Sequence, residues 1–257
     1  MITAGIDCGT QNTKTVILKD GKIACKAKVL TGFDLEKAVE NSLNKAVRTA
    51  GIVRQDIRRI CGTGSGKDSI KMADADVNDI QAMSKGAHFF FPTARTVIDV
   101  GAEEGRAAKI DEKGGPVDFA VNEKCAAGAG AFIESMARAL EVAIEQMGPL
   151  SLKSDKKIPM NAQCVIFAES EVVALIHAGT AKSDICKAIH DSMAGRIVSM
   201  VRRIGVNRDI VMLGGVGYNV GFVAAMKREL KIDNILVPDS PEYGSALGAA
   251  FLAAEES

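Results

Sequence analysis

A segment near the start of the chain is repeated near its middle, and this repeat limits the folds open to the chain. Residues 6–9 read IDCG and recur as IDVG at 98–101, Lys14 aligns with Arg106, and, after one inserted residue, Gly21 aligns with Gly114. Both copies predict a strand, a turn, a second strand, a tight turn and a third strand, because turn residues separate short apolar runs. A duplicated unit of this kind indicates an α/β chain with two similar lobes, and ligands commonly bind in the cleft between such lobes.

Helices are predicted after each copy of the repeat. Apolar residues recur at helical spacing in residues 35–50, where Asp34 can cap the first turn and Gly51 can end the last. The same reasoning predicts helices at 79–90, 129–147, 165–178, 185–204, 220–230 and 245–254, and strands at 57–61, 209–213 and 234–237. Gly148 and Pro149 are expected to stop the helix at 129–147.

Composition argues against several classes of function. Lys and Arg number 32, and Asp and Glu also number 32, so the formal net charge is zero. A neutral chain gives no electrostatic reason to bind nucleic acid or an anionic membrane surface. Aromatic residues make up 4% of the chain and Trp is absent, which argues against stacking of bases or sugars on aromatic rings.

The N-terminus and the cysteines indicate the compartment. Residues 1–7 read as a first strand rather than a signal peptide, and no apolar run approaches the length of about 18 residues that a membrane span needs. The six cysteines include no CxxC pair, which argues against a self-contained metal site, and disulfides are disfavoured in such a chain. We therefore expect a cytoplasmic protein.

The first of three glycine-bearing turns covers residues 7–14, which read DCGTQNTK. A carboxylate at the end of a strand, here Asp7, can hold a Mg²⁺-bound water, and the backbone amides around Gly9 can face a phosphate. The hydroxyls of Thr10 and Thr13 add donors, and Lys14 is the last predicted ligand of the nucleotide in this segment.

The other two turns repeat and extend this arrangement. Residues 99–104 read DVGAEE, with Asp99 at the position of Asp7, Gly101 in the turn, and Glu103 as a further candidate catalytic carboxylate. The third turn follows a predicted strand, and its glycines would let a sugar or base approach the backbone closely. These glycines are Gly214, Gly215 and Gly217.

A fourth glycine-rich stretch imitates a P-loop. Residues 61–68 read CGTGSGKD, but the P-loop pattern requires Gly where Cys61 stands and Ser or Thr where Asp68 stands. We interpret this stretch as a strand-end loop near the cleft.

A single DxG turn is most often an ordinary hairpin, but three such segments in order are a stronger pattern. Together they resemble the phosphate-1, phosphate-2 and adenosine motifs of the superfamily of actin, heat-shock ATPases and sugar kinases. The resemblance implies the actin-like ATPase (ASKHA) fold, with two duplicated ribonuclease-H-like lobes and ATP or ADP with Mg²⁺ in the cleft. It implies a first lobe of residues 1–94, completed by a C-terminal helix at 243–257, and a second lobe of residues 95–242.

Two cysteines stand just before predicted helices. Cys125 lies in the segment NEKCAAGAG and Cys164 in the segment QCVIFAESEVV. The N-terminus of a helix lowers the pKa of a thiol and stabilises an anionic cluster. Either cysteine alone would more often be an ordinary buried thiol.

The two segments resemble the cluster-binding segments of an ATPase family, and the resemblance covers essentially the whole chain. The family includes the 2-hydroxyacyl-CoA dehydratase activators and the ATP-binding subunits of benzoyl-CoA reductase. It implies that two ATPase chains share one [4Fe–4S] cluster, each contributing two cysteines, here Cys125 and Cys164. ATP hydrolysis would change the angle between the lobes and drive a low-potential electron to a catalytic partner. Cys8, Cys25, Cys61 and Cys186 are expected to be structural.

The second turn distinguishes the subgroups of the family. Dehydratase activators typically carry DIGGQD, whereas Ala102 and Glu103 replace the second glycine and the glutamine here. The sequence VIDVGAEEGRAAKID looks more like the D-type ATPase chain of benzoyl-CoA reductase, an enzyme of anaerobic aromatic degradation. This implies a heterodimer with a paralogous ATPase chain, catalytic CoA-thioester reductase subunits as partners, and a donor such as ferredoxin or flavodoxin. The alternative is a homodimeric activator of a 2-hydroxyacyl-CoA dehydratase.

Two further function classes stay open. A small-molecule kinase of the same fold would need a general base, usually a carboxylate at the start of a helix in the second lobe, and residues 125–132 contain none. A sensor chain that does not hydrolyse ATP is consistent with the altered Ala102 and Glu103.

Overall fold

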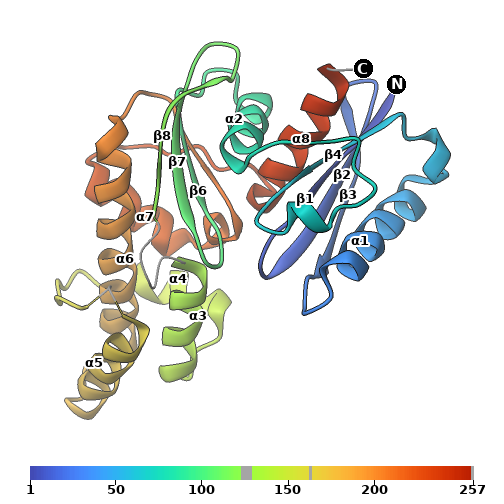
Figure 1. Ribbon diagram of the computed structural model, residues 1–257. Coiled ribbons are helices and arrows are strands. Elements are labelled where there is room, and N and C mark those ends of the chain that lie inside the picture. The colour runs from blue at the N-terminus through green and yellow to red at the C-terminus, as the bar shows by residue number, and fades with distance from the viewer. Residues whose placement is uncertain (123–128, 162–163, 256–257) are drawn as a thin grey trace.

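Two β-sheets lie on either side of a central pair of helices (Figure 1). The computed structural model of the chain describes residues 1–122, 129–161 and 164–255. None of the helices in these ranges is long and apolar enough to cross a membrane.

The first sheet contains the first copy of the repeat. Its strands are β1 (Ile2–Cys8), β2 (Asn12–Lys19), β3 (Lys22–Leu30), β4 (Arg59–Thr63) and β5 (Ala75–Asp76), in the spatial order β3-β2-β1-β4-β5. Helix α1 (Leu35–Ala50) covers one face and buries Val39 and Leu43 against Ile6 of β1. As expected, the side chain of Asp34 caps α1, and Gly51 ends it in the left-handed conformation.

The second sheet has the same arrangement. Its strands are β6 (Thr96–Val100), β7 (Gly105–Ile110), β8 (Pro116–Val121) and β9 (Ile210–Leu213), in the order β8-β7-β6-β9. In both sheets three antiparallel strands are followed by a strand parallel to the first, β4 beside β1 and β9 beside β6. The registers also agree, because Asp7 faces Lys14 across β1 and β2, and Asp99 faces Arg106 across β6 and β7. The structure therefore confirms the repeat.

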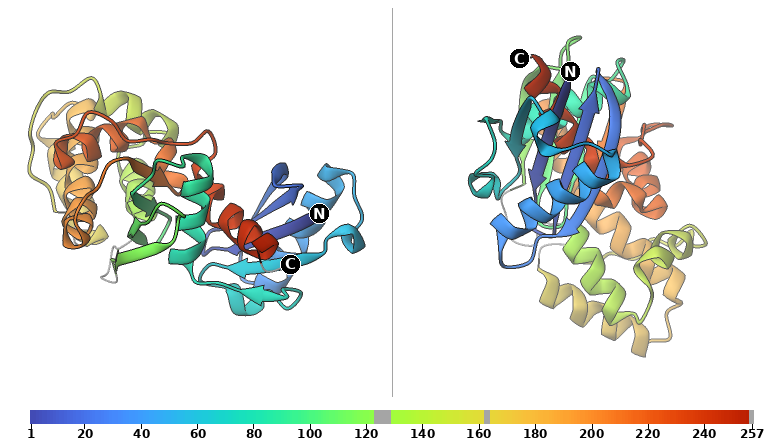
Figure 2. Two further views of the ribbon diagram at one scale, coloured as in Figure 1. Left: turned by 90° about the horizontal axis from the view of Figure 1, so that it is seen from above. Right: turned by 90° about the vertical axis from the view of Figure 1, so that its right-hand side faces the viewer.

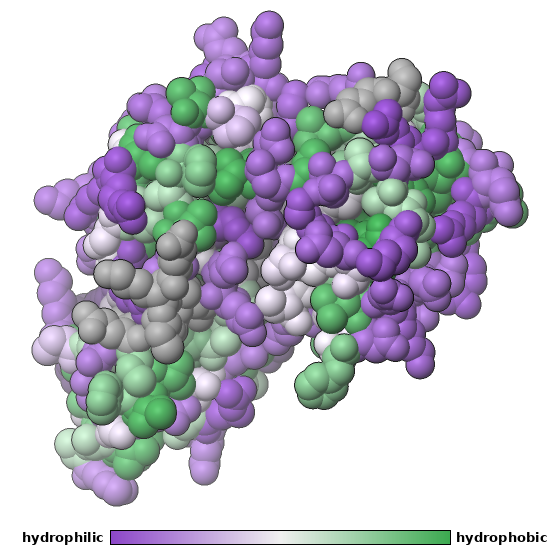
Figure 3. Space-filling model, viewed as in Figure 1, coloured by the Kyte–Doolittle hydropathy of each residue, from purple (hydrophilic) through white to green (hydrophobic). Residues whose placement is uncertain are grey.

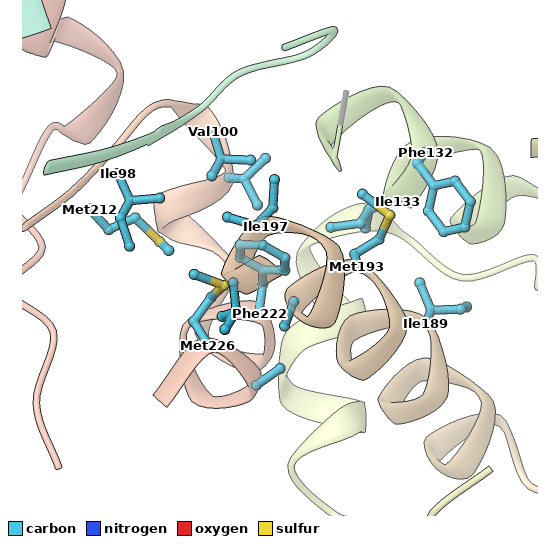
Figure 4. Close-up of a cluster of buried hydrophobic side chains, with 14 of the residues drawn as sticks. Ile98, Val100, Phe132, Ile133, Ile189, Met193, Ile197, Met212, Phe222 and Met226 are labelled. Carbon is cyan, nitrogen blue, oxygen red and sulfur yellow. The ribbon is translucent and has the colours of Figure 1, made fainter. Parts of the chain in front are cut away.

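A group of helices lies on the outer side of the second sheet, and the longest of them packs directly on β7 and β8. They are α3 (Ala129–Ala139), α4 (Ile144–Ser151), α5 (Val165–His177), α6 (Lys182–Ile204) and α7 (Val220–Leu230). Figure 4 shows how Ile98 and Val100 of β6 meet Ile197 of α6 and Phe222 of α7. Phe132 of α3 is fully buried in the same cluster, so the inner side of α3 is anchored in this lobe.

Helices α2 (Asp79–Phe90) and α8 (Gly244–Glu255) form the layer between the two sheets, as Figures 1 and 2 show. Helix α8 packs on β1 at Gly5, where an added Cβ atom would overlap the backbone of α8. Helices α2 and α8 also approach each other closely, because a Cβ atom on Gly86 or Gly248 would overlap the backbone of the other helix. Met83 of α2 belongs to the core of the second sheet. The C-terminal helix is thus packed against the N-terminal strand.

Two predicted elements differ in the structure. The helix expected at 129–147 is two helices, because the chain takes a left-handed conformation at Glu141 between α3 and α4. Pro149 was expected to end this helix but lies inside α4, where a proline near a helix end removes only one hydrogen bond. The strand expected at 234–237 is reduced to one parallel bridge between Leu236 and Val211.

Candidate functional site

A cavity of about 610 Å³ lies where strands of both sheets end. Its lining includes the loops that follow β1, β4, β6 and β9. Strands β1 and β4 are parallel, as are β6 and β9, so the carboxyl ends of each pair lie at the same edge of its sheet. This is the edge at which α/β proteins bind ligands. The volume lies within the range of about 300–1,000 Å³ that is usual for small-molecule sites.

The first turn contributes four of its five predicted ligands to the cleft. Asp7, Gly9, Thr10 and Lys14 line the cavity, and Lys14 Nζ lies 2.6 Å from Asp7 Oδ2. Burial by itself would lower the pKa of Lys14, but the neighbouring carboxylates, Asp7 above all, raise it above its usual value. Lys14 therefore keeps a positive charge in the cleft.

Thr13 does not reach the cleft, although the sequence placed it among the ligands. Its side chain is fully buried, and its hydroxyl lies 2.9 Å from the hydroxyl of Thr31. Thr31 in turn donates to the carbonyl oxygen of Gly9 at 2.7 Å. Alternate residues of a strand point to opposite faces, and Thr13 supports the turn from behind rather than facing a ligand.

The second turn carries a different electrostatic arrangement. Asp99, Gly101 and Glu103 line the cavity, as does Arg106. Arg106 does not bond to Asp99, which it faces across the sheet, but binds Glu104 and lies 3.4 Å from Asp79 at the start of α2. Burial raises the pKa of Asp99 to about 6; Arg106 opposes this shift and Asp7 adds to it.

The third turn brings two of its three glycines to the cleft. Gly214 has a φ of 84°, and a Cβ atom there would lie 2.5 Å from Asp99 Oδ1. A Cβ atom on Gly215 would meet nothing within 4 Å, so this position leaves open space in the cleft. Gly217 does not line the cavity, because it packs against Pro241, where a Cβ atom would come within 3.1 Å. The cleft lining also includes the apolar side chains of Ile144, Pro149 and Val216.

The loop that imitates a P-loop lies at the cleft, as expected. Gly64 and Ser65 line the cavity after β4. Gly64 has a φ of 93°, and a Cβ atom there would lie 2.5 Å from Asp7 Oδ1. The loop therefore packs against the carboxylate of the first turn.

Five cleft carboxylates were not among the predicted site residues: Asp79, Glu104, Glu134, Glu145 and Glu242. Two of them matter most here, and one of these corrects an argument made from the sequence. Asp79 lies at the N-terminus of α2, and burial raises its pKa while Arg106 opposes the shift. Glu134 of α3 also lines the cavity, two residues beyond the stretch that contains no carboxylate. The absence of a carboxylate from residues 125–132 is therefore no argument against a kinase. The apolar spacing that predicts α3 could have indicated Glu134, because it follows Gly130 by four residues on the same helix face.

The cysteines fall into two groups. Four thiols are buried, those of Cys8, Cys25, Cys61 and Cys186. Cys164 is partly exposed directly before α5, and Cys125 lies outside the described residues. In the described ranges, no group of three or more His, Cys, Asp or Glu side chains is placed to hold a metal ion.

Known proteins resemble the chain over its whole length. The sequence profile of the BadF/BadG/BcrA/BcrD ATPase family matches residues 4–253. The chain is 40% identical to an activator of lactoyl-CoA dehydratase from Anaerotignum propionicum, covering 99% of this chain and 98% of that protein. It is 37% identical to a 2-hydroxyisocaproyl-CoA dehydratase activator from Clostridioides difficile, covering 100% and 96%. The D-type chain of benzoyl-CoA reductase from Thauera aromatica is 32% identical, covering 97% and 92%.

Solved structures agree with the fold. Component A of the (R)-2-hydroxyglutaryl-CoA dehydratase of Acidaminococcus fermentans superposes with a TM-score of 0.94 at 34% identity, covering 100% of this chain and 98% of that one. A ROK-family glucokinase from Streptomyces griseus, 15% identical, superposes with a TM-score of 0.65 over 99% of this chain and 100% of that one and is similar in fold alone. These findings confirm the actin-like ATPase fold. They correct the preference for the D-type chain of the reductase, because both dehydratase activators are more similar to this protein.

Proposed function

Because the chain belongs to the BadF/BadG/BcrA/BcrD ATPase family, we propose that it is an ATP-hydrolysing activator of a 2-hydroxyacyl-CoA dehydratase. The observation that carries the proposal is its full-length similarity to dehydratase activators, at 40%, 37% and 36% identity, against 32% for the D-type chain of benzoyl-CoA reductase. In this role the chain would use ATP to deliver a low-potential electron to the dehydratase. The organic substrate would bind to the dehydratase rather than to this chain.

The cleft residues have the chemistry that ATP binding requires. We propose that the amides around Gly9 and Gly101 and the cation of Lys14 hold the phosphates, which carry most of the negative charge of the nucleotide. Asp7 and Asp99 would flank the Mg²⁺–phosphate group from opposite lobes. The open space at Gly215, together with apolar side chains of the lining, would receive the adenosine. Glu103 would orient the attacking water.

One described cysteine supports the proposal of a cluster held between two chains. Cys164 is the described cysteine with a partly exposed thiol, and it precedes the N-terminus of α5, whose partial positive charge would stabilise an anionic cluster. We propose that Cys125 and Cys164 hold one half of a [4Fe–4S] cluster, and that the cluster supplies one-electron transfer at low potential when bound. Two thiolates from each chain make the four that such a cluster needs.

A homodimer is the assembly that we propose. Helix α5 exposes Ile166 and Phe167, with exposed fractions of 70% and 63%, directly after Cys164. Figure 3 shows apolar surface over the region where α5 lies in Figure 1. A cluster on a two-fold axis would bring this surface of one chain against the same surface of the other. The partners would be the dehydratase and a one-electron donor such as ferredoxin or flavodoxin.

The experiment that tests this function reconstitutes dehydration without oxygen. The purified chain, a 2-hydroxyacyl-CoA dehydratase and a chemical reductant should dehydrate a 2-hydroxyacyl-CoA only when ATP is added. Native mass spectrometry of the same preparation should show a homodimer with one four-iron cluster. A colourless protein that transfers phosphate to a sugar would contradict the proposal in favour of a kinase.

The D-type ATPase chain of benzoyl-CoA reductase is the second candidate. The observation that favours it is the second turn, where Ala102 and Glu103 depart from the activator pattern. In that case the chain alone should bind little iron, and co-expression with a paralogous ATPase chain should restore a one-to-one complex with a single cluster.

A further inference from the structure

A hydrogen-bonded pair of side chains joins the two sides of the cleft. Gln11 lies in the turn after β1, and Glu134 lies on α3 of the second half of the chain. Gln11 Nε2 lies 3.2 Å from Glu134 Oε1 and 3.3 Å from Glu134 Oε2. Both residues line the cavity. The nucleotide contacts proposed for the cleft use neither side chain.

Helix α3 is also attached to the second turn. The backbone N–H of Gly130 donates to the carbonyl oxygen of Gly101 at 3.1 Å, and that of Ala131 donates to Ala102 at 2.9 Å. The contact is close, because a Cβ atom on Gly130 would lie 2.9 Å from the Cα atom of Ala102. Glu134 follows Gly130 by one helical turn and faces the same cavity. The first two turns of α3 therefore contact both phosphate-binding turns.

The charge of Glu134 makes this contact sensitive to the number of phosphates. Its carboxylate lines the same cavity as Thr10, Gly101 and Glu103, where the terminal phosphate of ATP would lie. ADP carries no group there and leaves the pair intact. The γ-phosphate of ATP brings negative charge that repels Glu134, and it competes for the N–H donors of Gln11.

We propose that the Gln11–Glu134 pair is a γ-phosphate sensor that stays closed with ADP and opens with ATP. The proposal rests on the proposed function, because it assumes that the cleft binds these nucleotides. Opening of the pair releases α3 from the first turn while its bonds to Gly101 and Ala102 remain. Helix α3 also packs against α5, which begins directly after Cys164, so its displacement is transmitted toward that cysteine.

The test compares the dissociation constants of ADP and of a non-hydrolysable ATP analogue by calorimetry. Glu134→Gln keeps the size of the side chain and removes its charge. In this variant the dissociation constant of the analogue, divided by that of ADP, should fall by about tenfold. The repulsion between Glu134 and the γ-phosphate is lost, whereas the binding of ADP is little changed. Glu134→Ala should lower the ratio in the same direction. Glu134→Asp, which keeps the charge, should leave it near the wild-type value.

The control is Arg138→Ala, which removes an exposed charge from the same helix at a position that does not line the cavity. It should leave the ratio unchanged. Hydrogen exchange of residues 129–139 should be faster with the ATP analogue than with ADP in the wild type, and this difference should shrink in Glu134→Gln. An unchanged ratio in Glu134→Gln and Glu134→Ala, with both nucleotides bound, would overturn the sensor and leave the proposed function standing. Failure of the wild type to bind either nucleotide would overturn both.

Discussion

Each of the two repeated turns sets a basic residue opposite an aspartate, but the two pairs behave differently. Lys14 bonds directly to Asp7, whereas Arg106 bonds to Glu104 and Asp79. Asp99 therefore lacks the partner that Asp7 has, and burial raises its pKa to about 6. The basic residues of the two copies thus pair differently, because Arg106 has Glu104 and Asp79 beside it.

His190 gives a prediction for the dependence of stability on pH. It is fully buried on α6, with Asn219 Nδ2 2.9 Å from its Nε2, and burial lowers its pKa to about 4. Between pH 6.5 and about 4 the unfolded chain binds more protons at this position than the folded chain. The free energy of unfolding is therefore highest above the unfolded pKa and falls as the pH is lowered. Because of His190, we expect the free energy of unfolding to be about 2 kcal/mol lower at pH 5 than at pH 7.5.

Urea denaturation at several pH values measures this contribution. The His190→Gln variant should lose less stability on acidification than the wild type. The matched control is His177→Gln, because His177 is exposed on α5. In this control, the free energy of unfolding should depend on pH as it does in the wild type. If His190→Gln also shows the wild-type dependence, His190 is not responsible for it.

The cysteines give a second prediction at the residue scale. Cys164→Ser should abolish the visible absorbance of the anaerobically purified protein, because serine is a poor ligand for iron. Cys186→Ser should keep the absorbance but lower the unfolding free energy by about 1–3 kcal/mol, because a hydroxyl would replace a buried thiol beside Met147. Full absorbance in Cys164→Ser would contradict the assignment of this cysteine to a cluster.

At the scale of elements, α3 is the helix whose two sides make different contacts. One side buries Phe132 and Met136 in the core of the second half, and the other places Gly130 and Glu134 at the cleft. The position of α3 therefore depends on both the core and the occupant of the cleft.

The contact of α3 with the second turn can be tested at Gly130. Gly130→Ala places a methyl group 2.9 Å from the backbone of Gly101 and Ala102, and we expect a loss of about 1–3 kcal/mol in unfolding free energy. The ATP analogue should also bind more weakly. Gly195→Ala on α6 is the matched control, because its Cβ atom would meet nothing within 4 Å, and it should gain about 0.5–1 kcal/mol. Equal effects of the two substitutions in urea denaturation would argue against the close contact.

At the scale of the whole molecule, α2 and α8 form the junction between the two sheets. Helix α8 comes from the end of the chain and packs on β1, while α2 packs on the second sheet. We propose that residues 1–94 with 243–257 move as one lobe and residues 95–242 as the other. Both helices belong to the first lobe, so the pivot of this motion would lie where Met83 and Ala87 of α2 pack on the second sheet.

The surface of α5 gives a prediction about assembly. Phe167→Asp should convert the dimer to monomer in sedimentation experiments under anaerobic conditions, because it places a charge in a surface that we propose to be buried. ADP should still bind, since Phe167 does not line the cleft. Phe119→Asp, at an exposed aromatic residue of β8, is the control and should leave the dimer intact. A dimer that survives Phe167→Asp would place the interface elsewhere.

The sequence by itself determined the features that depend on neighbouring residues. Residues 35–50 form the predicted helix with its predicted cap at Asp34, because capping and amphipathic spacing act within a few residues. The repeat of residues 6–9 at 98–101 predicted two similar sheets, because equal patterns of strands and turns fold alike. The predicted ligands at the tips of the turns, such as Gly9 and Gly101, reach the cleft for the same reason.

Only the tertiary structure decided which side chains share the cleft. Asp79 begins α2 and Glu134 lies within α3, and no local pattern states that these two helices start at the same cavity. Thr13 was misplaced because its burial depends on Thr31, which lies beyond the end of the next strand. Cleft lining is a property of contacts between distant segments, and these contacts are set by how the sheets and helices pack rather than by the spacing of residues along the chain.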